Sequence, residues 1–226
     1  MPIRGDELRP GDQVVVPTRW CEPPRYSQYV DLVDELLALP PEQTGRVYLY
    51  HIRAAWDDDI QVALRPHLSR MRRLYDYKQY DYLPFNLLRL LDPAQRERLK
   101  QVSLVGNHNV KLPAIWPVDE ALVELLGLYT AEGCLTQHRR YRSVVLSFGA
   151  QEPALIKYTA ELVERALSYK VRPTYVHQSA RIVKISCDFV ALLFEAVFKA
   201  GVCSTRKTVP PPVSYTHLTL PTIYSV

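Results

Sequence analysis

Long apolar runs are absent from this chain of 226 residues, and no stretch approaches the roughly 20 residues that a membrane-spanning helix needs. The N-terminus, MPIRGDELRPGDQ, is charged from Arg4 onward and lacks the apolar stretch of a secretory signal. These two absences argue against membrane and secreted classes. We therefore expect a cytoplasmic protein with no membrane partner.

Closely spaced cysteines are also absent. The four cysteines, Cys21, Cys134, Cys187 and Cys203, include no pair with the two-to-four-residue spacing that a zinc site uses. We expect reduced cysteines that fill apolar space, and no zinc.

Acidic residues are missing from particular segments. Between Cys134 and Pro212 there are twelve Lys or Arg against five acids, although the whole chain carries only +4. Segments 134–151 and 169–187, where we predict strands, hold seven of these basic residues and no acid, whereas the predicted helices between and after them are each net −1. A sheet with helices on one face and only positive charge on the other suits duplex DNA, because phosphate neutralisation supplies much of the affinity.

Chance segregation of charge is the alternative. The best candidates for contact with DNA are basic residues of these segments, with two side chains as possible base-edge readers. They are Arg139, Arg140, Arg142, Arg172, Arg181 and Lys184, with Tyr175 and His177 as the readers.

Periodicity and capping residues predict the elements of the second half of the chain. A helix begins near Asp119 and ends at Gly133, and a later helix begins after Asp188, as its cap, and closes at Gly201. The full set is helix 119–133, a possible strand around 134–140, strand 141–148, helix 153–168, strands 171–178 and 181–187, and helix 189–201. The predicted class is α+β with the order α-β-β-α-β-β-α.

The first half is less regular. Residues 8–17, LRPGDQVVVP, predict a turn and a short strand, and the stretch from Trp20 to about Leu104 favours helices. Within it, residues 60–91 interleave basic residues with five aromatics, which suits phosphate contacts and base stacking, or else a solvated helix face with tyrosines at the edge of a core. We predict that 20–112 is a mainly helical linker and an accessory region for DNA contact.

The last fourteen residues, 213–226, carry no charge, no helical period and no capping signal. They resemble the conceptual translation of a sequencing adapter, and we expect them not to be native. A genuine β-strand is the alternative, because Thr, Tyr, Leu, Ile and Val suit one.

The segment 125-LLGLYTAEG-133 resembles the motif of LAGLIDADG (DOD-type) homing endonucleases, with Gly127, Ala131 and Gly133 identical and Glu132 in place of the final Asp. FGAQE at 148–152 is similar to the family's step into its second helix, and KAGVCSTRKTVP at 199–210 to the step that closes the first repeat. LRPGDQVVVP is similar to a strand that precedes the endonuclease in inteins, the self-splicing branch of the family. The resemblance covers roughly residues 8–212.

The resemblance implies a fold and a chemistry. It implies an intein splicing-domain remnant at 1–19 and a first LAGLIDADG repeat at 113–212, whose sheet forms a saddle for double-stranded DNA. Gly127 and Ala131 would let two motif helices pack closely, Glu132 and Gly133 would bind Mg²⁺, and Lys207 would assist the hydrolytic water or the transition-state charge. The expected activity is site-specific hydrolysis of both DNA strands, and the host exteins are expected partners.

The chain departs from the family pattern in three places. No second acid-terminated motif follows residue 212, so we expect that the chain is cut after the first repeat and that it is inactive alone. No Cys-initiated splice junction precedes residue 8. The pair His108-Asn109 is followed by Val110, not by Cys, Ser or Thr. Two alternatives stay open: a DNA-binding module of the same fold without catalysis, and a self-splicing element whose nuclease has decayed.

Overall fold

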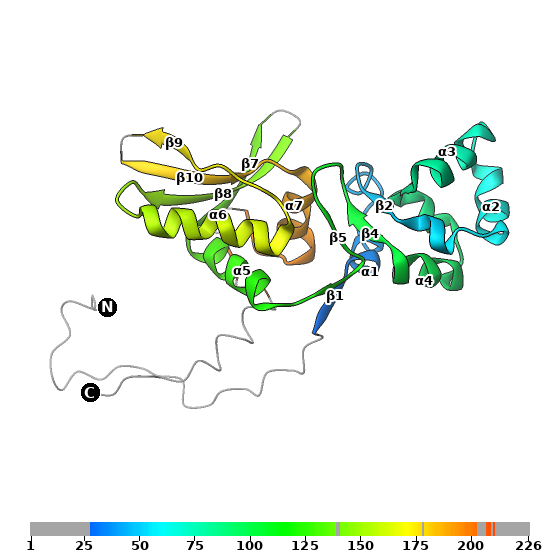
Figure 1. Ribbon diagram of the computed structural model, residues 1–226, viewed down its shortest axis with the longest axis horizontal. Helices are drawn as coiled ribbons and strands as arrows, with labels where there is room; N and C mark the ends of the chain where they lie inside the picture. The colour runs from blue at the N-terminus through cyan, green and yellow to red at the C-terminus, as the bar shows by residue number, and fades with distance from the viewer. Residues whose placement is uncertain (1–27, 139–140, 178, 203–206, 209, 211–226) are drawn as a thin grey trace.

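The computed structural model describes residues 28–138, 141–177, 179–202, 207, 208 and 210. The strand predicted at 8–17, the proposed splicing remnant at 1–19 and the segment 213–226 lie outside the described residues. The described elements form two units that lie side by side in Figure 1. We call residues 28–118 the N-terminal unit and residues 119–202 the C-terminal unit.

The C-terminal unit is an antiparallel sheet with helices, and it confirms the α+β class. Its sheet has the order β7-β8-β10-β9, and every neighbouring pair is antiparallel. The strand suggested around 134–140 exists as β7. In chain order the elements are α5 (Glu120–Glu132), β7 (Gly133–His138), β8 (Tyr141–Gly149), α6 (Pro153–Leu167), β9 (Thr174–His177), β10 (Ala180–Ile185) and α7 (Asp188–Leu192).

Local chemistry sets the ends of two of these helices. The Asp119 side chain accepts the N–H of Leu122 at 2.8 Å and caps α5. Helix α6 begins with Pro153, where a missing N–H costs nothing, and ends at Ser168, which adopts the left-handed conformation with φ 51°.

The last helix differs from its prediction. Cys187 occupies the N-cap position and Asp188 is the first helical residue, so Asp188 does not cap α7. The α-helical part ends at Leu192 and continues as a π-helical turn, η5 (Leu193–Val197), well before Gly201. The carboxylate of Asp188 instead accepts hydrogen bonds from the N–H of Arg142 and from the side chain of Arg46.

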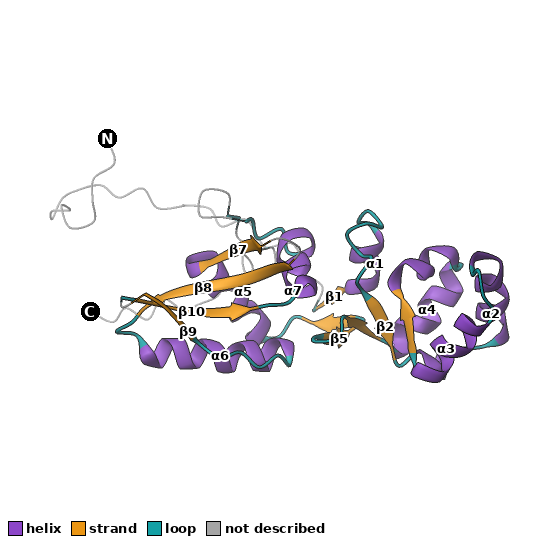
Figure 2. Cartoon of the chain, turned by 90° about the horizontal axis from the view of Figure 1, so that it is seen from above, coloured by secondary structure: helices purple, strands orange, loops and turns teal. Residues whose placement is uncertain are grey.

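One face of this sheet is covered by helices. Val144, Leu146 and Phe148 alternate along β8 and are at most 5% exposed. Figures 1 and 2 show α5 and α6 on one side of the sheet. The opposite face carries Thr136 and Lys184, both exposed.

The N-terminal unit contains four α-helices and two small sheets. The larger sheet has the order β3-β2-β4-β5, and β1 pairs with β6. The prediction of a mainly helical region missed these strands, because each is only three residues long and gives no period. The elements are β1 (Tyr29–Asp31), α1 (Leu32–Leu37), β2 (Tyr48–Tyr50), η2 (Ile52–Ala55), α2 (Asp58–Leu64), η3 (Arg65–His67), α3 (Arg72–Tyr80), β3 (Tyr82–Pro84), η4 (Phe85–Leu90), α4 (Pro93–Val102), β4 (Leu104–Gly106), β5 (Lys111–Pro113) and β6 (Ile115–Pro117).

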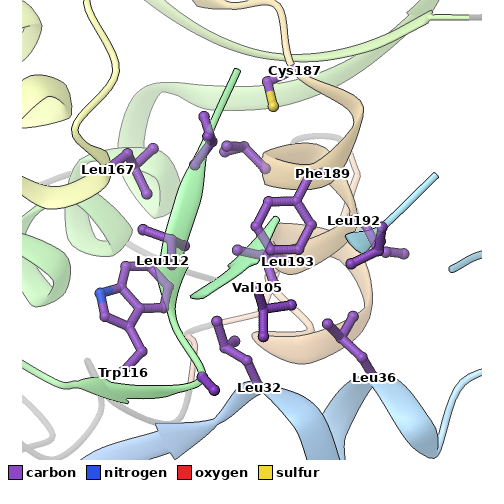
Figure 3. Packing of buried hydrophobic residues seen from close by; sticks show 14 of the residues in the cluster. Leu32, Leu36, Val105, Leu112, Trp116, Leu167, Cys187, Phe189, Leu192 and Leu193 are labelled. Carbon is purple, nitrogen blue, oxygen red and sulfur yellow. The ribbon is translucent and has the colours of Figure 1, made fainter. Parts of the chain in front are cut away.

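The two units share one hydrophobic core. Figure 3 shows Leu36 and Val105 of the N-terminal unit against Phe189, Leu192 and Leu193 of the C-terminal unit, and all five are at most 2% exposed. Burial of each such side chain contributes about 1.5–3 kcal/mol. Docking of the units is therefore part of the folding free energy.

Among the described residues, no helix is both long enough and apolar enough to cross a membrane. Two of the four cysteines, Cys134 and Cys187, are described, and both are free thiols. Burial raises the pKa of the Cys187 thiol, which keeps it protonated.

Candidate active site and nucleic-acid interface

The motif helix α5 ends at an exposed carboxylate. Glu132 is its last residue, and Gly133 begins β7 without any intervening loop. A Cβ at Gly133 would lie 2.3 Å from the Tyr129 ring and 2.6 Å from the Tyr129 carbonyl oxygen. Only glycine lets the chain pass from helix to strand at this point, which is why the last motif glycine follows the acid directly.

Tyr129 anchors this end of the helix. Its side chain is fully buried, its ring packs edge-on to Phe194 with centroids 4.8 Å apart, and its hydroxyl donates to the carbonyl of Gly201 at 2.5 Å. The position of Glu132 is therefore fixed by the packing of α5 against the helix that closes the unit.

Lys207 lies beside the same helix end. Its Nζ donates to the carbonyl oxygen of Ala131 at 3.1 Å and lies 5.9 Å from the centroid of the Tyr129 ring. A cation at a helix C-terminus is favoured by the helix dipole and satisfies a carbonyl that has no partner within the helix. The two residues predicted to be catalytic, Glu132 and Lys207, are thus brought to one place although 75 positions separate them.

Gly127 and Ala131 lie on an edge of α5 that is accessible to solvent. Gly127 is half-buried and Ala131 is exposed, and the two lie one helical turn apart. Elsewhere α5 packs on α6, where the hydroxyl of Tyr158 donates to Glu124 at 2.5 Å. The prediction that Gly127 and Ala131 meet a second motif helix stays a prediction.

The donor atoms at the end of α5 suit half of a site for a hard cation. The described residues contain no group of three or more His, Cys, Asp or Glu side chains that could hold a metal ion. Glu132 offers one carboxylate, and the carbonyl of Gly133 is next to it in the chain. Mg²⁺ is commonly bound through one or two carboxylates, with water and substrate phosphates as its other ligands. Glu132 and Gly133 fit that pattern only with ligands from outside this helix.

Two of the residues predicted to contact DNA lie where a ligand can reach them. Lys184 is exposed on the open face of the sheet, paired in register with Val145. Arg172 is exposed in the segment between α6 and β9.

Arg142 does not match its prediction. Its Nη1 lies 2.7 Å from Glu195 of η5, its side chain is 29% exposed, and its backbone N–H donates to Asp188 at 2.6 Å. Arg142 follows the alternation of Val144 and Leu146, so its side chain lies on the helix-covered face. An internal carboxylate neutralises its charge.

Arg181 also departs from its prediction. It shares the strand phase of Val183 and Ile185, both fully buried, and it lines a cavity of about 320 Å³ together with residues of α6. Its side chain therefore faces the helices, and the open face carries fewer basic residues than predicted.

The remaining candidates are only partly described. Arg139 and Arg140 lie outside the described residues. The backbone of Tyr175 pairs with Arg181 and that of His177 pairs with Ala180, with a register shift between Ala180 and Arg181. The side chains of Tyr175 and His177 lie outside the described part of the chain.

A cleft between the units was not predicted from the sequence. It has a volume of about 670 Å³, and its wall includes Arg46, Tyr48 and His108 from the N-terminal unit and Gln137 and Arg142 from the C-terminal unit. Only tertiary contacts create this cleft, so no local sequence signal could have revealed it.

Asp188 is part of the wall of that cleft. One carboxylate oxygen accepts the N–H of Arg142, and the other accepts Nη1 of Arg46 at 3.1 Å. Nearby, the Asn107 amide donates to the Cys187 sulfur at 3.2 Å. These polar contacts join the two units at the surface, above their shared core.

Comparison with known proteins gives two relatives, and no protein-family model matches the chain. A DNA polymerase of Pyrococcus horikoshii is 26% identical over 233 aligned positions, which cover 80% of this chain and 18% of the polymerase. A DNA polymerase of Thermococcus kodakarensis is 25% identical over 266 positions, which cover 92% of this chain and 15% of that protein. The chain therefore spans less than a fifth of either relative.

Proposed function

We propose that the C-terminal unit is one repeat of a LAGLIDADG-type homing endonuclease, carried within an intein, which hydrolyses phosphodiester bonds in duplex DNA. The observation that carries the proposal is the approach of Lys207 to the end of α5, one residue from Glu132. A lysine hydrogen-bonded to Ala131 places positive charge beside the carboxylate on which the proposed chemistry depends. The α-β-β-α-β-β-α order of the unit agrees with it.

In this proposal each residue has a separate role. Glu132 and the carbonyl of Gly133 would hold Mg²⁺, which when bound activates water and stabilises the leaving oxygen. The Lys207 ammonium would stabilise negative charge developing on the phosphate. Gly127 and Ala131 would allow a second motif helix to approach α5 closely and bring a second carboxylate.

The similarity to the two polymerases supports the intein assignment. Most of this chain matches a small part of each polymerase, as expected of an element inserted into a longer polypeptide. In that case the partners of the whole protein are double-stranded DNA and the flanking exteins.

The decisive experiment measures cleavage of an archaeal DNA polymerase gene from which the matched segment has been removed. We expect cleavage that requires Mg²⁺ and rises faster than linearly with protein concentration, because two motif helices must meet. Glu132→Gln should abolish cleavage and retain duplex affinity, and Lys207→Met should slow it by about 100-fold or more. Glu120→Gln, at the far end of the same helix, is the matched control and should cleave normally.

A second measurement does not depend on turnover. Binding of Mn²⁺ to the complex of protein and DNA, followed by electron paramagnetic resonance, should be lost in Glu132→Gln and kept in Glu120→Gln. Normal cleavage and normal Mn²⁺ binding by Glu132→Gln would overturn the assignment. Duplex binding without cleavage or Mn²⁺ binding by the unaltered chain would favour the DNA-binding module instead.

A further inference from the structure

Four consecutive backbone carbonyls follow the π-helical turn, and each accepts a hydrogen bond from another part of the chain. Lys199 and Gly201 adopt the left-handed conformation, with φ 51° and 78°, which ends the helical path. We call residues 199–202 the carbonyl turn. In order, the carbonyls of Lys199, Ala200, Gly201 and Val202 accept from the Thr208 hydroxyl, the Thr208 N–H at 3.3 Å, the Tyr129 hydroxyl at 2.5 Å and the Leu135 N–H at 2.9 Å.

Tyr129 links the carbonyl turn to the end of the motif helix. It lies about one helical turn before Glu132, and its ring lies against Gly133, where a Cβ would be only 2.3 Å away. Its hydroxyl, on a fully buried side chain, donates to the turn, and the N–H of Leu135 in β7 binds the next carbonyl. The turn is therefore bound to both segments that flank the carboxylate of Glu132.

Thr208 binds the same turn from the other side. Both its N–H and its hydroxyl donate to the carbonyl turn, although the residue is exposed. Thr208 follows Lys207 directly, so these two bonds set the place from which the Lys207 side chain starts. The carbonyl turn thus connects Tyr129 with the backbone beside Lys207.

The bond between Lys207 and Ala131 does not by itself account for the place of the ammonium group. Fixing a long lysine side chain costs conformational entropy, and one hydrogen bond that is exposed to water gains little. The Nζ reaches the Ala131 carbonyl at 3.1 Å, and the Tyr129 ring at 5.9 Å, from a backbone that other groups hold. Those groups are the donors to the carbonyl turn.

We propose that the hydroxyls of Tyr129 and Thr208 are positioning groups that hold Lys207 against the carbonyl of Ala131, beside Glu132. Both act through the backbone of the carbonyl turn. The placement of Lys207 follows from these contacts alone, whereas its effect on cleavage rests on the proposed function. If the hydroxyls only stabilised the fold, their removal would not act on Lys207 in particular, and measurements specific to Lys207 separate the two roles.

The first test needs no cleavage. The full chain and its variants are treated with formaldehyde and a borohydride, which methylate accessible amines, and mass spectrometry gives the rate at Lys207. Tyr129→Phe and Thr208→Val each remove one hydroxyl and should raise that rate about 3-fold, because the amine then loses its bond to Ala131 for part of the time. Thr208→Ser keeps the hydroxyl and should label as the unaltered chain does.

Three controls come from the same chain. Tyr158→Phe removes a hydroxyl that donates to Glu124 at 2.5 Å, elsewhere on the motif helix, and should leave the rate at Lys207 unchanged. Lys157, with a side chain 80% exposed, gives the rate of an exposed amine in every variant. Lys100, with a side chain 11% exposed, should label slowly while the protein is folded, so it reports any general loosening.

The second test measures cleavage with the protein in excess over DNA. Tyr129→Phe and Thr208→Val should each slow cleavage about 10-fold without loss of duplex affinity. Neither should slow Lys207→Met any further, because the hydroxyls act through the lysine. Thr208→Ser and Tyr158→Phe should cleave as the unaltered chain does.

Unchanged labelling of Lys207 in both Tyr129→Phe and Thr208→Val would overturn the inference, whatever the cleavage rates. Faster labelling of Lys100 in step with Lys207 would overturn it too, and so would an equal slowing of cleavage with and without the Lys207 amine. In these cases the hydroxyls would support only the fold. Failure of the proposed function gives another result: Lys207 would label faster as expected, which supports its positioning, while the unaltered chain cleaved no DNA.

Discussion

The two units are stabilised in different ways. The C-terminal unit relies on long elements that bury one apolar face, such as the fifteen-residue α6 and the nine-residue β8. The N-terminal unit joins many short elements through side chains that bind backbone carbonyls. Arg89 alone donates to the carbonyls of Leu36, Leu37 and Leu39 at 3.2, 2.7 and 2.7 Å. Short helices and strands leave many backbone carbonyls at their ends without partners, and charged side chains donate hydrogen bonds to these carbonyls.

The largest effect should come from truncating a large apolar side chain of the C-terminal unit. Phe194 is fully buried between Tyr129 and Phe198, with centroids 4.8 and 6.0 Å away. Phe194→Ala should lower the free energy of unfolding by about 4 kcal/mol, through lost burial and a cavity. Urea unfolding measures this loss. The control is Lys157→Ala, which alters a side chain that is 80% exposed and should change the free energy of unfolding by no more than about 0.5 kcal/mol. A loss below 1 kcal/mol for Phe194→Ala would break the comparison.

In the N-terminal unit a charged residue should also have a large effect. Arg89→Met keeps most of the apolar stem but removes a donor from three carbonyls at and after the end of α1, of which that of Leu36 still accepts the N–H of Leu39. We expect a loss of about 3 kcal/mol. Arg72→Met is the matched control, because the Arg72 side chain is 88% exposed and its ion pair with Asp76 is long, at 3.9 Å. The same urea titration compares them. Equal stability of the two variants would mean that these carbonyl contacts do not hold the unit together.

Lys100 should show a smaller effect with a clear pH dependence. Its side chain is 11% exposed and lies 2.7 Å from Asp31 and 2.8 Å from Glu97. Burial lowers its pKa, but hydrogen bonds to these two carboxylates outweigh burial, and the net shift is upward from 10.5. We expect Lys100→Met to cost about 2 kcal/mol at pH 7.

The sign of the shift fixes the pH window. A folded-state pKa above 10.5 means that the contribution of Lys100 is complete below pH 10.5 and declines as the pH rises further. The difference between Lys100→Met and the unaltered chain should therefore be constant from pH 7 to 9 and shrink above 10.5. A difference that grew with alkaline pH would show that the lysine is not stabilised in its charged form.

The smallest effect concerns a hydroxyl in each unit. The Tyr50 hydroxyl is buried and finds no hydrogen-bond partner within the described residues, whereas the Tyr129 hydroxyl is bonded to Gly201. Tyr50→Phe should stabilise the protein by up to about 1 kcal/mol, and Tyr129→Phe should destabilise it by about 1 kcal/mol. Thermal melting of the two variants gives the sign of each, and destabilisation by Tyr50→Phe would reveal a bond to that hydroxyl in solution.

The same contrast explains which parts of the fold could be predicted from the sequence. Helix α5 was predicted with both ends, because Asp119 and Gly133 flank an apolar run. The four strands of the larger N-terminal sheet were not, since three residues carry no period and their pairing spans up to 58 positions between Tyr48 and Gly106. Their tyrosines were assigned to helices or left unassigned.

The candidate site was predicted unevenly. The resemblance gave Glu132 and Lys207, and the structure places Lys207 against the carbonyl of Ala131, the residue before Glu132. Arg142 and Arg181 were assigned to the open face because both lie in acid-free segments, but composition does not indicate which way a strand residue points. The alternation with Val144 and with Val183 did contain that information. Both arginine side chains lie on the helix-covered face of the sheet, because their stems pack on apolar neighbours and Arg142 pairs with Glu195.

The π-helical turn η5 has a consequence for the reach of the chain beyond it. The N–H of Phe198 donates to the carbonyl of Leu193 at 2.8 Å, five residues back, so this turn holds one residue more than an α-helical turn. Deleting one residue here would restore α-helical spacing and rotate everything that follows by about 100°. Phe198 would leave its contact with Trp116, and the segment that delivers Lys207 would start in another direction. The number of residues in this buried turn therefore influences whether Lys207 can reach the C-terminal end of α5.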